Sequence, residues 1–255
     1  MNRKVLAFLM AFIIPSNFYG SVDFDGTDDY FDCGFVTVPD TSFTIAAWIK
    51  INTGASIRQM HVISLGTSDL PEIQLSVDAA VSEPTKFATY CTIYSPDSGG
   101  TISQLADCPV GYCITPGQWH HIACTNDGGE MVPFIDGIPY TAKATGGLNG
   151  GASVNLLMAN DVFLAASYFY GEINDPVFFN TELSLSEIQT MAFSRMRNTI
   201  IPTDSLSRKQ FYFPLDDFPD GTSVSGRNLI DRTGLGNACT GTNGGTSRAD
   251  ILRYP

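Results

Sequence analysis

Residues 43–51 read Phe43-Thr-Ile-Ala-Ala-Trp-Ile-Lys-Ile51 and decide the fold class. Side chains alternate between the two faces of a strand, so Phe43, Ile45 and Ile49 share one face. Ala46 and Trp48 fall on the opposite face. Because both faces are apolar, the pattern predicts a strand that is covered on both sides.

Working outward, the same alternation recurs in short segments bounded by Gly, Pro, Asn, Asp and Ser. The further predicted strands are residues 61–65, 72–77, 87–94, 120–125, 132–135, 138–142, 162–166, 171–180 and 210–215. Their spacing of roughly ten residues is typical of a β-sandwich or barrel. Asp136-Gly137 predicts a tight hairpin, because Gly accepts positive φ. Residues 148–155 and 234–247 are rich in Gly, Asn and Thr and are predicted to be loops.

One helix is predicted. Ser184-Leu-Ser-Glu187 has the capping-box pattern, in which the Ser hydroxyl and the Glu carboxylate accept free amide hydrogens of the first turn. Apolar residues then follow at helical spacing: Ile188, Met191, Ala192 and Met196. We expect a short surface helix packed on a sheet.

Three segments, in this order, carry a resemblance to a known family. They are residues 22–31 (Val-Asp-Phe-Asp-Gly-Thr-Asp-Asp-Tyr-Phe) with 43–50, residues 117–128 (Gly-Gln-Trp-His-His-Ile-Ala-Cys-Thr-Asn-Asp-Gly) with 134–137, and residues 170–180 (Tyr-Gly-Glu-Ile-Asn-Asp-Pro-Val-Phe-Phe-Asn) with 183–188. Together they resemble the laminin-G-like group of concanavalin A-like jelly rolls. The resemblance implies an all-β fold, a two-sheet antiparallel jelly-roll sandwich with one short helix.

A fourth segment is displaced from its place in the family. Residues 211–217 and 229–237 resemble a stretch that in bacterial members usually precedes the first motif, but here it follows the last one. We therefore expect three parts: an apolar leader at 1–20, a jelly roll at 21–195, and a C-terminal extension at 196–255 that completes the same domain.

The N-terminus has the character of an export signal. Arg3 and Lys4 precede ten apolar residues, Val5–Ile14. Such a run is too short for a bilayer core of about 30 Å, and a basic start before it favours a secretory leader. An uncleaved anchor and a packed terminal strand are the alternatives. We expect the protein to be secreted or located at the cell surface. The alternative location is a virus particle.

The formal net charge is −12, and residues 21–194 contain four basic side chains: Lys50, Arg58, Lys86 and Lys143. This disfavours nucleic acid, since phosphate binding needs a basic surface. Anionic lipid is disfavoured for the same reason. Neutral ligands, cationic ligands and divalent cations stay open.

Six cysteines behind an export signal suggest disulfides. Cys108 and Cys113 flank a turn-like Pro-Val-Gly-Tyr sequence, which favours a local bridge between them. Cys91 and Cys124 both fall in predicted strands. Buried free thiols are the alternative, whereas the absence of Cys-x-x-Cys and of spaced histidines disfavours zinc.

The family resemblance also implies a Ca²⁺ site. Asp25, Asp28 and Asp29 lie in the first motif and Asp175 lies in the last, and in the family these segments are neighbouring strands. We expect Asp25 and Asp175 to hold the ion through carboxylate oxygens, which Ca²⁺ prefers. Asn174 replaces one acidic residue of the family pattern. The alternative is that the aspartates only cap turns.

The sequence favours a binding module over an enzyme. Retaining glycosidases need two carboxyl groups about 5 Å apart, and the E-x-D-x-(x)-E strand pattern that provides them is missing. His120, His121, Trp48 and Trp119 are expected to be structural, while Tyr90, Tyr94, Tyr112, Tyr168 and Tyr170 are candidates for recognition. The expected function is binding of a glycan or cell-surface protein. The alternatives are a virus-particle protein that contacts other virion components, and a glycan-cleaving enzyme.

Overall fold

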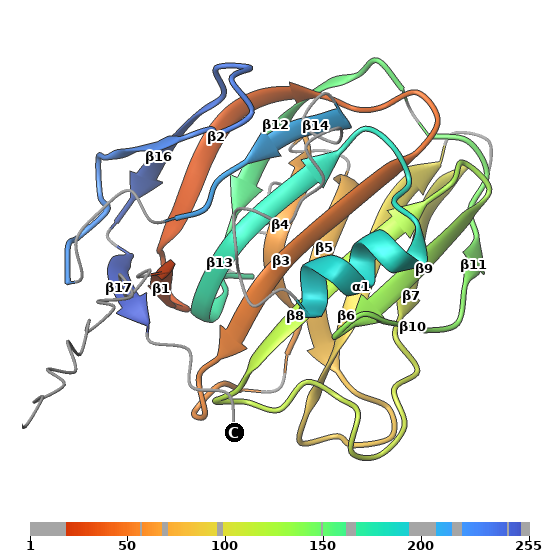
Figure 1. Cartoon of the computed structure of the whole chain (residues 1–255), viewed down its shortest axis with the longest axis horizontal. Coiled ribbons are helices and arrows are strands. Elements are labelled where there is room, and N and C mark those ends of the chain that lie inside the picture. The colour runs from red at the N-terminus through yellow and green to blue at the C-terminus, as the bar shows by residue number, and fades with distance from the viewer. Residues whose placement is uncertain are drawn as a thin grey trace, which may run out of the picture.

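The computed structural model of the chain describes residues 19–56, 58–67, 71–95, 99–148, 150–161, 167–193, 208–215, 221–243 and 245–250. Over these ranges it is an antiparallel jelly-roll sandwich of two sheets with one helix (Figure 1). This is the predicted fold class.

The nine-stranded sheet runs in the order β10 (Ile138–Pro139), β9 (Glu130–Ile135), β8 (Trp119–Asn126), β3 (Phe43–Ile51), β13 (Tyr170–Phe179), β1 (Tyr19–Asp25) and β17 (Thr246–Asp250); β11 (Lys143–Ala144) also pairs with β9, and β14 (Lys209–Tyr212) also pairs with β13. The eight-stranded sheet runs in the order β15 (Asn228–Ile230), β16 (Ala238–Thr242), β2 (Tyr30–Thr37), β12 (Ser153–Met158), β4 (Met60–Gly66), β5 (Pro71–Ala79), β6 (Phe87–Ser95) and β7 (Gly100–Leu105).

The strand that opened the sequence argument lies in the middle of the first sheet. Eight of its nine residues are buried, and the ninth, Lys50, is half-buried. Phe43, Ile45 and Ile49 join the core between the two sheets. Ala46 lies on the outer face in a second apolar cluster, which includes Ile188 of the helix. The prediction that both faces of residues 43–51 are covered is therefore confirmed.

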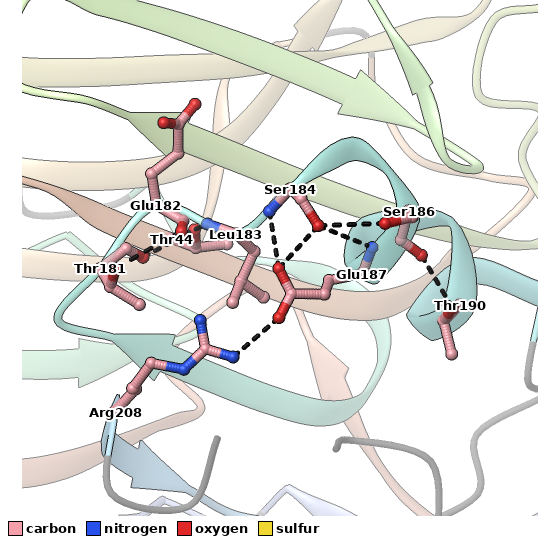
Figure 2. Close-up of polar contacts among 9 residues, drawn as sticks. All are labelled: Thr44, Thr181, Glu182, Leu183, Ser184, Ser186, Glu187, Thr190 and Arg208. Atoms are coloured by element: carbon pink, nitrogen blue, oxygen red, sulfur yellow. Dashed lines mark hydrogen bonds and ion pairs between the residues drawn. The ribbon is translucent and has the colours of Figure 1, made fainter. Parts of the chain in front are cut away.

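The helix α1 (Leu185–Phe193) supplies that outer cover and crosses the nine-stranded sheet (Figure 1). Its N-terminus has the predicted capping box. The Ser184 amide donates to Glu187 Oε2 at 2.8 Å, and the Glu187 amide donates to Ser184 Oγ at 3.4 Å (Figure 2). Arg208 Nη2 donates to Glu187 Oε1 at 2.7 Å, which ties the helix to the C-terminal segment. Met196, the last residue of the predicted helical pattern, lies outside the described residues.

The predicted hairpin joins β9 to β10. Its turn residues Asp136 and Gly137 have φ values of 51° and 76°, as a turn with positive φ at both central positions requires. Residues 138–142 were predicted to form the second strand. The observed strand is shorter: Ile138 and Pro139 pair with β9, and the Tyr140 amide donates to the Pro133 carbonyl oxygen at 2.9 Å.

Two segments that were predicted to be loops contain strands. β12 includes residues 153–155 of the first, while β16 and the start of β17 lie in the second. These strands form because each is hydrogen-bonded to β-structure elsewhere in the chain: β12 to β2 and β4, β16 to β2, and β17 to β1. The predicted strand at 162–166 lies outside the described residues.

The C-terminal segment contributes to both sheets. β14 pairs with β13 and β17 pairs with β1, while β15 and β16 extend the other sheet from β2. A disulfide joins Cys33 of β2 to Cys239 of β16. Tyr19 and Gly20, the last two residues of the predicted leader, pair with Asp250 and Ala249, and residues 1–18 lie outside the described ranges. No helix in the described ranges is long and apolar enough to cross a bilayer.

Candidate functional site

One end of the sandwich gathers aromatic and charged side chains from distant parts of the chain. Asp25 ends β1 and Tyr30 begins β2, while β3 ends and β13 begins at the same end of the molecule (Figure 1). The turn at 25–29, the segment around Arg58 and the segment leading to Tyr170 meet here. We call Asp25, Asp28, Tyr30, Arg58 and Tyr168 the rim site.

The turn between β1 and β2 is held by its own aspartates. Asp25 Oδ1 accepts the amides of Thr27 and Asp28 at 2.8 and 3.4 Å. Asp29 Oδ2 accepts the amide of Asp25 at 3.1 Å. Aspartate commonly stabilises turns in this way, through bonds to nearby backbone amides. The turn-capping alternative therefore describes Asp25 and Asp29 in this structure.

These carboxylates also form a compact acidic cluster. One oxygen from each of Asp25, Asp28 and Asp29 lies within 4.8 Å of the other two. Asp25 and Asp28 are exposed, whereas Asp29 is buried. Burial is the main cause that raises the pKa of Asp29, and the charges of Asp25 and Asp28 raise it further, against the lowering effect of the Asp25 amide. Three carboxylates at this spacing are the donor type that a hard divalent cation takes.

Donors from two other parts of the chain reach the backbone of the turn. Arg58 Nη2 donates to the carbonyl oxygens of Gly26 and Tyr168, both at 3.2 Å. Asn243 Nδ2 donates to the Asp28 carbonyl oxygen at 3.2 Å. Side chains from two other segments thus hold the backbone of the turn, while the carboxylates of Asp25, Asp28 and Asp29 lie close together on it.

Two tyrosine rings lie beside the acidic turn. The ring centroids of Tyr30 and Tyr168 are 6.4 Å apart with a 40° tilt, and both residues are half-buried. Tyr170 is half-buried as well and stands opposite Asp25 in the ladder between β13 and β1. Rings that are partly open to solvent can stack on an apolar ligand face while their hydroxyl groups stay hydrated.

A buried polar cluster on β4 and β5 contacts Asp161, and one of its members also holds the residue before Tyr168. Asp161 Oδ1 accepts hydrogen bonds from Ser64 Oγ at 3.0 Å and Gln74 Nε2 at 2.7 Å. His61 Nε2 lies 3.6 Å from Asp161 Oδ2, and the His61 amide donates to the Ser167 carbonyl oxygen at 3.1 Å. These contacts hold Asp161 against β4 and β5, and Ser167 against the start of β4.

The burial of this cluster affects the pKa of His61. Burial lowers the pKa of His61, and the Asp161 carboxylate opposes that shift. Both residues are almost fully buried. Sequence reasoning missed the cluster, although polar residues within the apolar strands β4 and β5 were a usable signal.

The predicted pairing of Asp25 with Asp175 does not occur. Asp25 stands opposite Tyr170, so Asp175 lies five positions further along β13, about 16 Å away at roughly 3.3 Å per residue. The β1–β13 neighbourhood was anticipated, but its register keeps the two carboxylates apart. Asp175 instead accepts a hydrogen bond from the Tyr212 hydroxyl at 2.8 Å.

Other candidate residues lie away from the rim site. Tyr90 and Tyr94 alternate with the core residues Cys91 and Ile93 on β6, which puts their side chains on the outer face of that strand. Tyr112 is 59% exposed in the loop that the Cys108–Cys113 disulfide closes.

The histidines and tryptophans have structural contacts. His120 Nδ1 lies 2.7 Å from Asp136 Oδ2, and its Nε2 accepts the Thr115 amide at 3.0 Å. His121 packs edge-on against the buried Trp48, with ring centroids 5.4 Å apart. Trp119 is half-buried, and Lys50 Nζ lies 5.7 Å from its ring centroid.

Comparison with solved structures supports the fold. A native heptameric SAP-like pentraxin from Limulus polyphemus is similar with a TM-score of 0.60 at 15% identity, covering 91% of this chain and 95% of that chain. A candidate carbohydrate binding protein from Bacteroides ovatus is similar with a TM-score of 0.62 at 15% identity, covering 93% of this chain and 62% of that chain. The chain therefore spans less than two thirds of the second protein.

Sequence comparison gives the family. No curated protein matches the chain. The profile described as the concanavalin A-like lectin/glucanases superfamily (Laminin_G_3) matches residues 25–189, which is well over half of the chain. The match begins at the first aspartate of the acidic turn and ends within α1. The chain belongs to the concanavalin A-like lectin/glucanases superfamily.

Proposed function

We propose that the protein is a non-catalytic binding module that holds a glycan at the rim site. The observation that carries the proposal is the pair of half-buried rings, Tyr30 and Tyr168, beside the exposed carboxylates of Asp25 and Asp28. A sugar presents an apolar C–H face and a ring of hydroxyl groups. Aromatic stacking suits the first, and charge-assisted hydrogen bonds suit the second.

The anchoring of Tyr168 supports this role. Its carbonyl oxygen accepts a hydrogen bond from Arg58, and the neighbouring Ser167 carbonyl accepts one from the His61 amide. Both contacts use the backbone, so they fix the chain while leaving the tyrosine ring for a ligand. Such preorganisation reduces the ordering cost of binding.

The proposal includes Ca²⁺ at the acidic turn. Asp25, Asp28 and Asp29 would hold the ion through carboxylate oxygens, and when bound it would supply positive charge for ligand hydroxyl groups. Asp28→Asn is the most specific test of the ion site. The side chains that accept hydrogen bonds from the turn's backbone are Asp25 and Asp29, so this variant should leave the turn intact. We expect Asp28→Asn to weaken Ca²⁺ binding in calorimetry while the unfolding midpoint in chelator stays unchanged. Equal Ca²⁺ affinity in the variant would remove Ca²⁺ from the proposal.

A glycan-cleaving enzyme is the alternative. A retaining enzyme places two carboxyl groups about 5 Å apart, and the carboxylates of Asp25, Asp28 and Asp29 have a similar spacing. Against it, Asp25 and Asp29 both accept backbone hydrogen bonds within their own turn. We therefore propose binding without cleavage. Release of reducing ends from a bound glycan, lost in Asp29→Asn, would favour the enzyme.

The main test is a glycan-array screen of the full chain with Ca²⁺ and with chelator. For a glycan that binds, Tyr168→Ala should weaken affinity about tenfold, which corresponds to the loss of one stacking ring. The backbone carbonyl that Arg58 contacts stays in this variant. Tyr94→Ala, on the outer face of β6, is the matched control and should leave affinity unchanged. Failure to bind any glycan, or equal losses in both variants, contradicts the rim site.

We also propose that the protein is exported. The disulfides Cys33–Cys239 and Cys108–Cys113 support an oxidising compartment. N-terminal sequencing of the native protein should then begin after the apolar leader. Retention of Met1 in the mature protein would count against a secretory leader.

A further inference from the structure

The two cysteines outside the disulfides enter the same core from different sheets. Of the six cysteines of the chain, four form Cys33–Cys239 and Cys108–Cys113. The remaining two are Cys91 of β6, in the eight-stranded sheet, and Cys124 of β8, in the nine-stranded sheet. Their exposures are 0% and 1%, and both belong to the core cluster between the two sheets.

The two sheets approach each other closely near Cys91 and Cys124. Thr89 Oγ1 of β6 donates to the Phe134 carbonyl oxygen of β9 at 2.8 Å. Phe134 stands opposite Ala123, the residue before Cys124, in the ladder between β9 and β8. A side-chain hydrogen bond thus spans the sandwich two residues from Cys91. Two cysteines that enter the core from facing sheets at so close an approach are placed to reach disulfide geometry.

Neither existing disulfide links the two sheets. Cys33 and Cys239 lie on β2 and β16 of the same sheet, and Cys108 and Cys113 close a single loop. We propose that Cys91 and Cys124 form the third disulfide of the mature protein and join the two sheets through the core.

The bond forms by thiol–disulfide exchange with a small disulfide oxidant such as oxidised glutathione. One cysteine thiolate attacks the oxidant to give a mixed disulfide and one reduced thiol. The second cysteine thiolate then attacks the cysteine sulfur of the mixed disulfide, which forms the Cys91–Cys124 bond and releases the second glutathione as a thiol. Two cysteine thiols lose two electrons and two protons, and one glutathione disulfide becomes two glutathione thiols.

Burial determines when this exchange can take place. Burial raises the pKa of the Cys91 thiol well above its usual value, and the neighbouring Cys124 raises it further. Because the thiolate is the reactive form, the pair in the closed sandwich reacts slowly. The bond is therefore made during folding, before β6 and β8 close over the core.

The experiment maps the disulfides of the full chain after refolding in reduced and oxidised glutathione. Free thiols are alkylated in denaturant without reductant, and the protein is cut before aspartate. Cys91 then lies in the peptide 78–96, and Cys108, Cys113 and Cys124 lie in the peptide 107–126. We expect no alkylated cysteine and a covalent link between these two peptides. Alkylation of both Cys91 and Cys124, with the other four cysteines bonded, overturns the proposal.

Two variants make the assignment specific. In Cys108→Ser/Cys113→Ser each of the two peptides keeps one cysteine, so a surviving link is Cys91–Cys124, and loss of the link refutes it. In Cys124→Ala the wild-type link should disappear and Cys91 should take up one alkyl group. A link that persists in Cys124→Ala assigns Cys91 to another partner and also refutes the proposal.

Discussion

Gly26 packs against Tyr170 so closely that a Cβ atom added to Gly26 would lie 2.7 Å from the Cβ of Tyr170. Gly26 also has a φ of +76°, a conformation that L side chains rarely adopt. The contact joins the acidic turn to the first residue of β13. Glycine at this position is therefore required by both conformation and space.

Gly26→Ala should destabilise the protein by about 2 to 4 kcal/mol in urea unfolding, from the positive φ plus overpacking. Gly34→Ala is the matched control. Gly34 has a φ of +66°, but nothing lies within 4 Å of its added Cβ, so only the conformational cost of about 1 kcal/mol applies. Equal decreases in the free energy of unfolding of the two variants would show that overpacking against Tyr170 does not add to the cost of Gly26→Ala.

Local patterns predicted most of the central architecture. The alternation at residues 43–51, the Asp136-Gly137 turn and the Ser184–Glu187 capping box each depend on neighbouring residues, and each is present. β12 and β16 were not predicted as strands. Residues 148–155, which include the start of β12, are rich in Gly and Asn, and β16 contains Gly and two Thr residues. Both strands form through pairing with β2. Such pairing depends on contacts more than a hundred residues apart.

The candidate site was less predictable than the fold. Asp25 and Asp28 were recognised from the first motif, whereas Arg58 and Asn243, which donate to the Gly26 and Asp28 carbonyl oxygens of the same turn, come from loops with no motif. The error in placing Asp175 beside Asp25 came from the strand register. A sequence can indicate that β1 and β13 are neighbours, but a shift along the strand moves each residue by about 3.3 Å.

The helix cap gives a second prediction. Ser184→Ala removes the hydroxyl that accepts the Glu187 amide (Figure 2) and should cost about 1 kcal/mol of stability. Thr190→Ala is the control. Thr190 Oγ1 donates to the Ser186 carbonyl oxygen inside the helix, and alanine is the better helix former, so this change should be nearly neutral. Chemical denaturation of both variants decides whether the cap or helix propensity in general stabilises α1.

The buried His121 should make the protein sensitive to mild acid. Burial lowers the pKa of His121 from 6.5 to about 4, against a smaller raising effect of Asp136. Between these values the unfolded chain binds a proton that the folded protein excludes, so stability falls as pH drops from 6.5 toward 4. The loss attributable to His121 is about 3 kcal/mol at most.

His121→Phe tests this by removing the titrating ring while keeping an aromatic contact with Trp48. Urea unfolding between pH 7 and pH 4 should show a shallower decline in the variant than in the wild type. His61, whose pKa is also lowered, keeps part of the slope. Parallel pH profiles for the two proteins would mean that His121 is not the titrating group.

The Cys33–Cys239 disulfide should contribute most to holding the C-terminal strands. The bond joins residues 206 positions apart, and cross-links that close long loops restrict the unfolded chain strongly, by about 3 to 5 kcal/mol. Cys33→Ala/Cys239→Ala should lower the free energy of unfolding by that order and raise hydrogen exchange in β15 and β16, which extend from β2. Cys108→Ala/Cys113→Ala, which opens a loop with a separation of 5, should cost less and leave exchange in β15 and β16 unchanged. Unchanged exchange in both variants would mean that pairing with β2, without the disulfide, is enough to hold these strands.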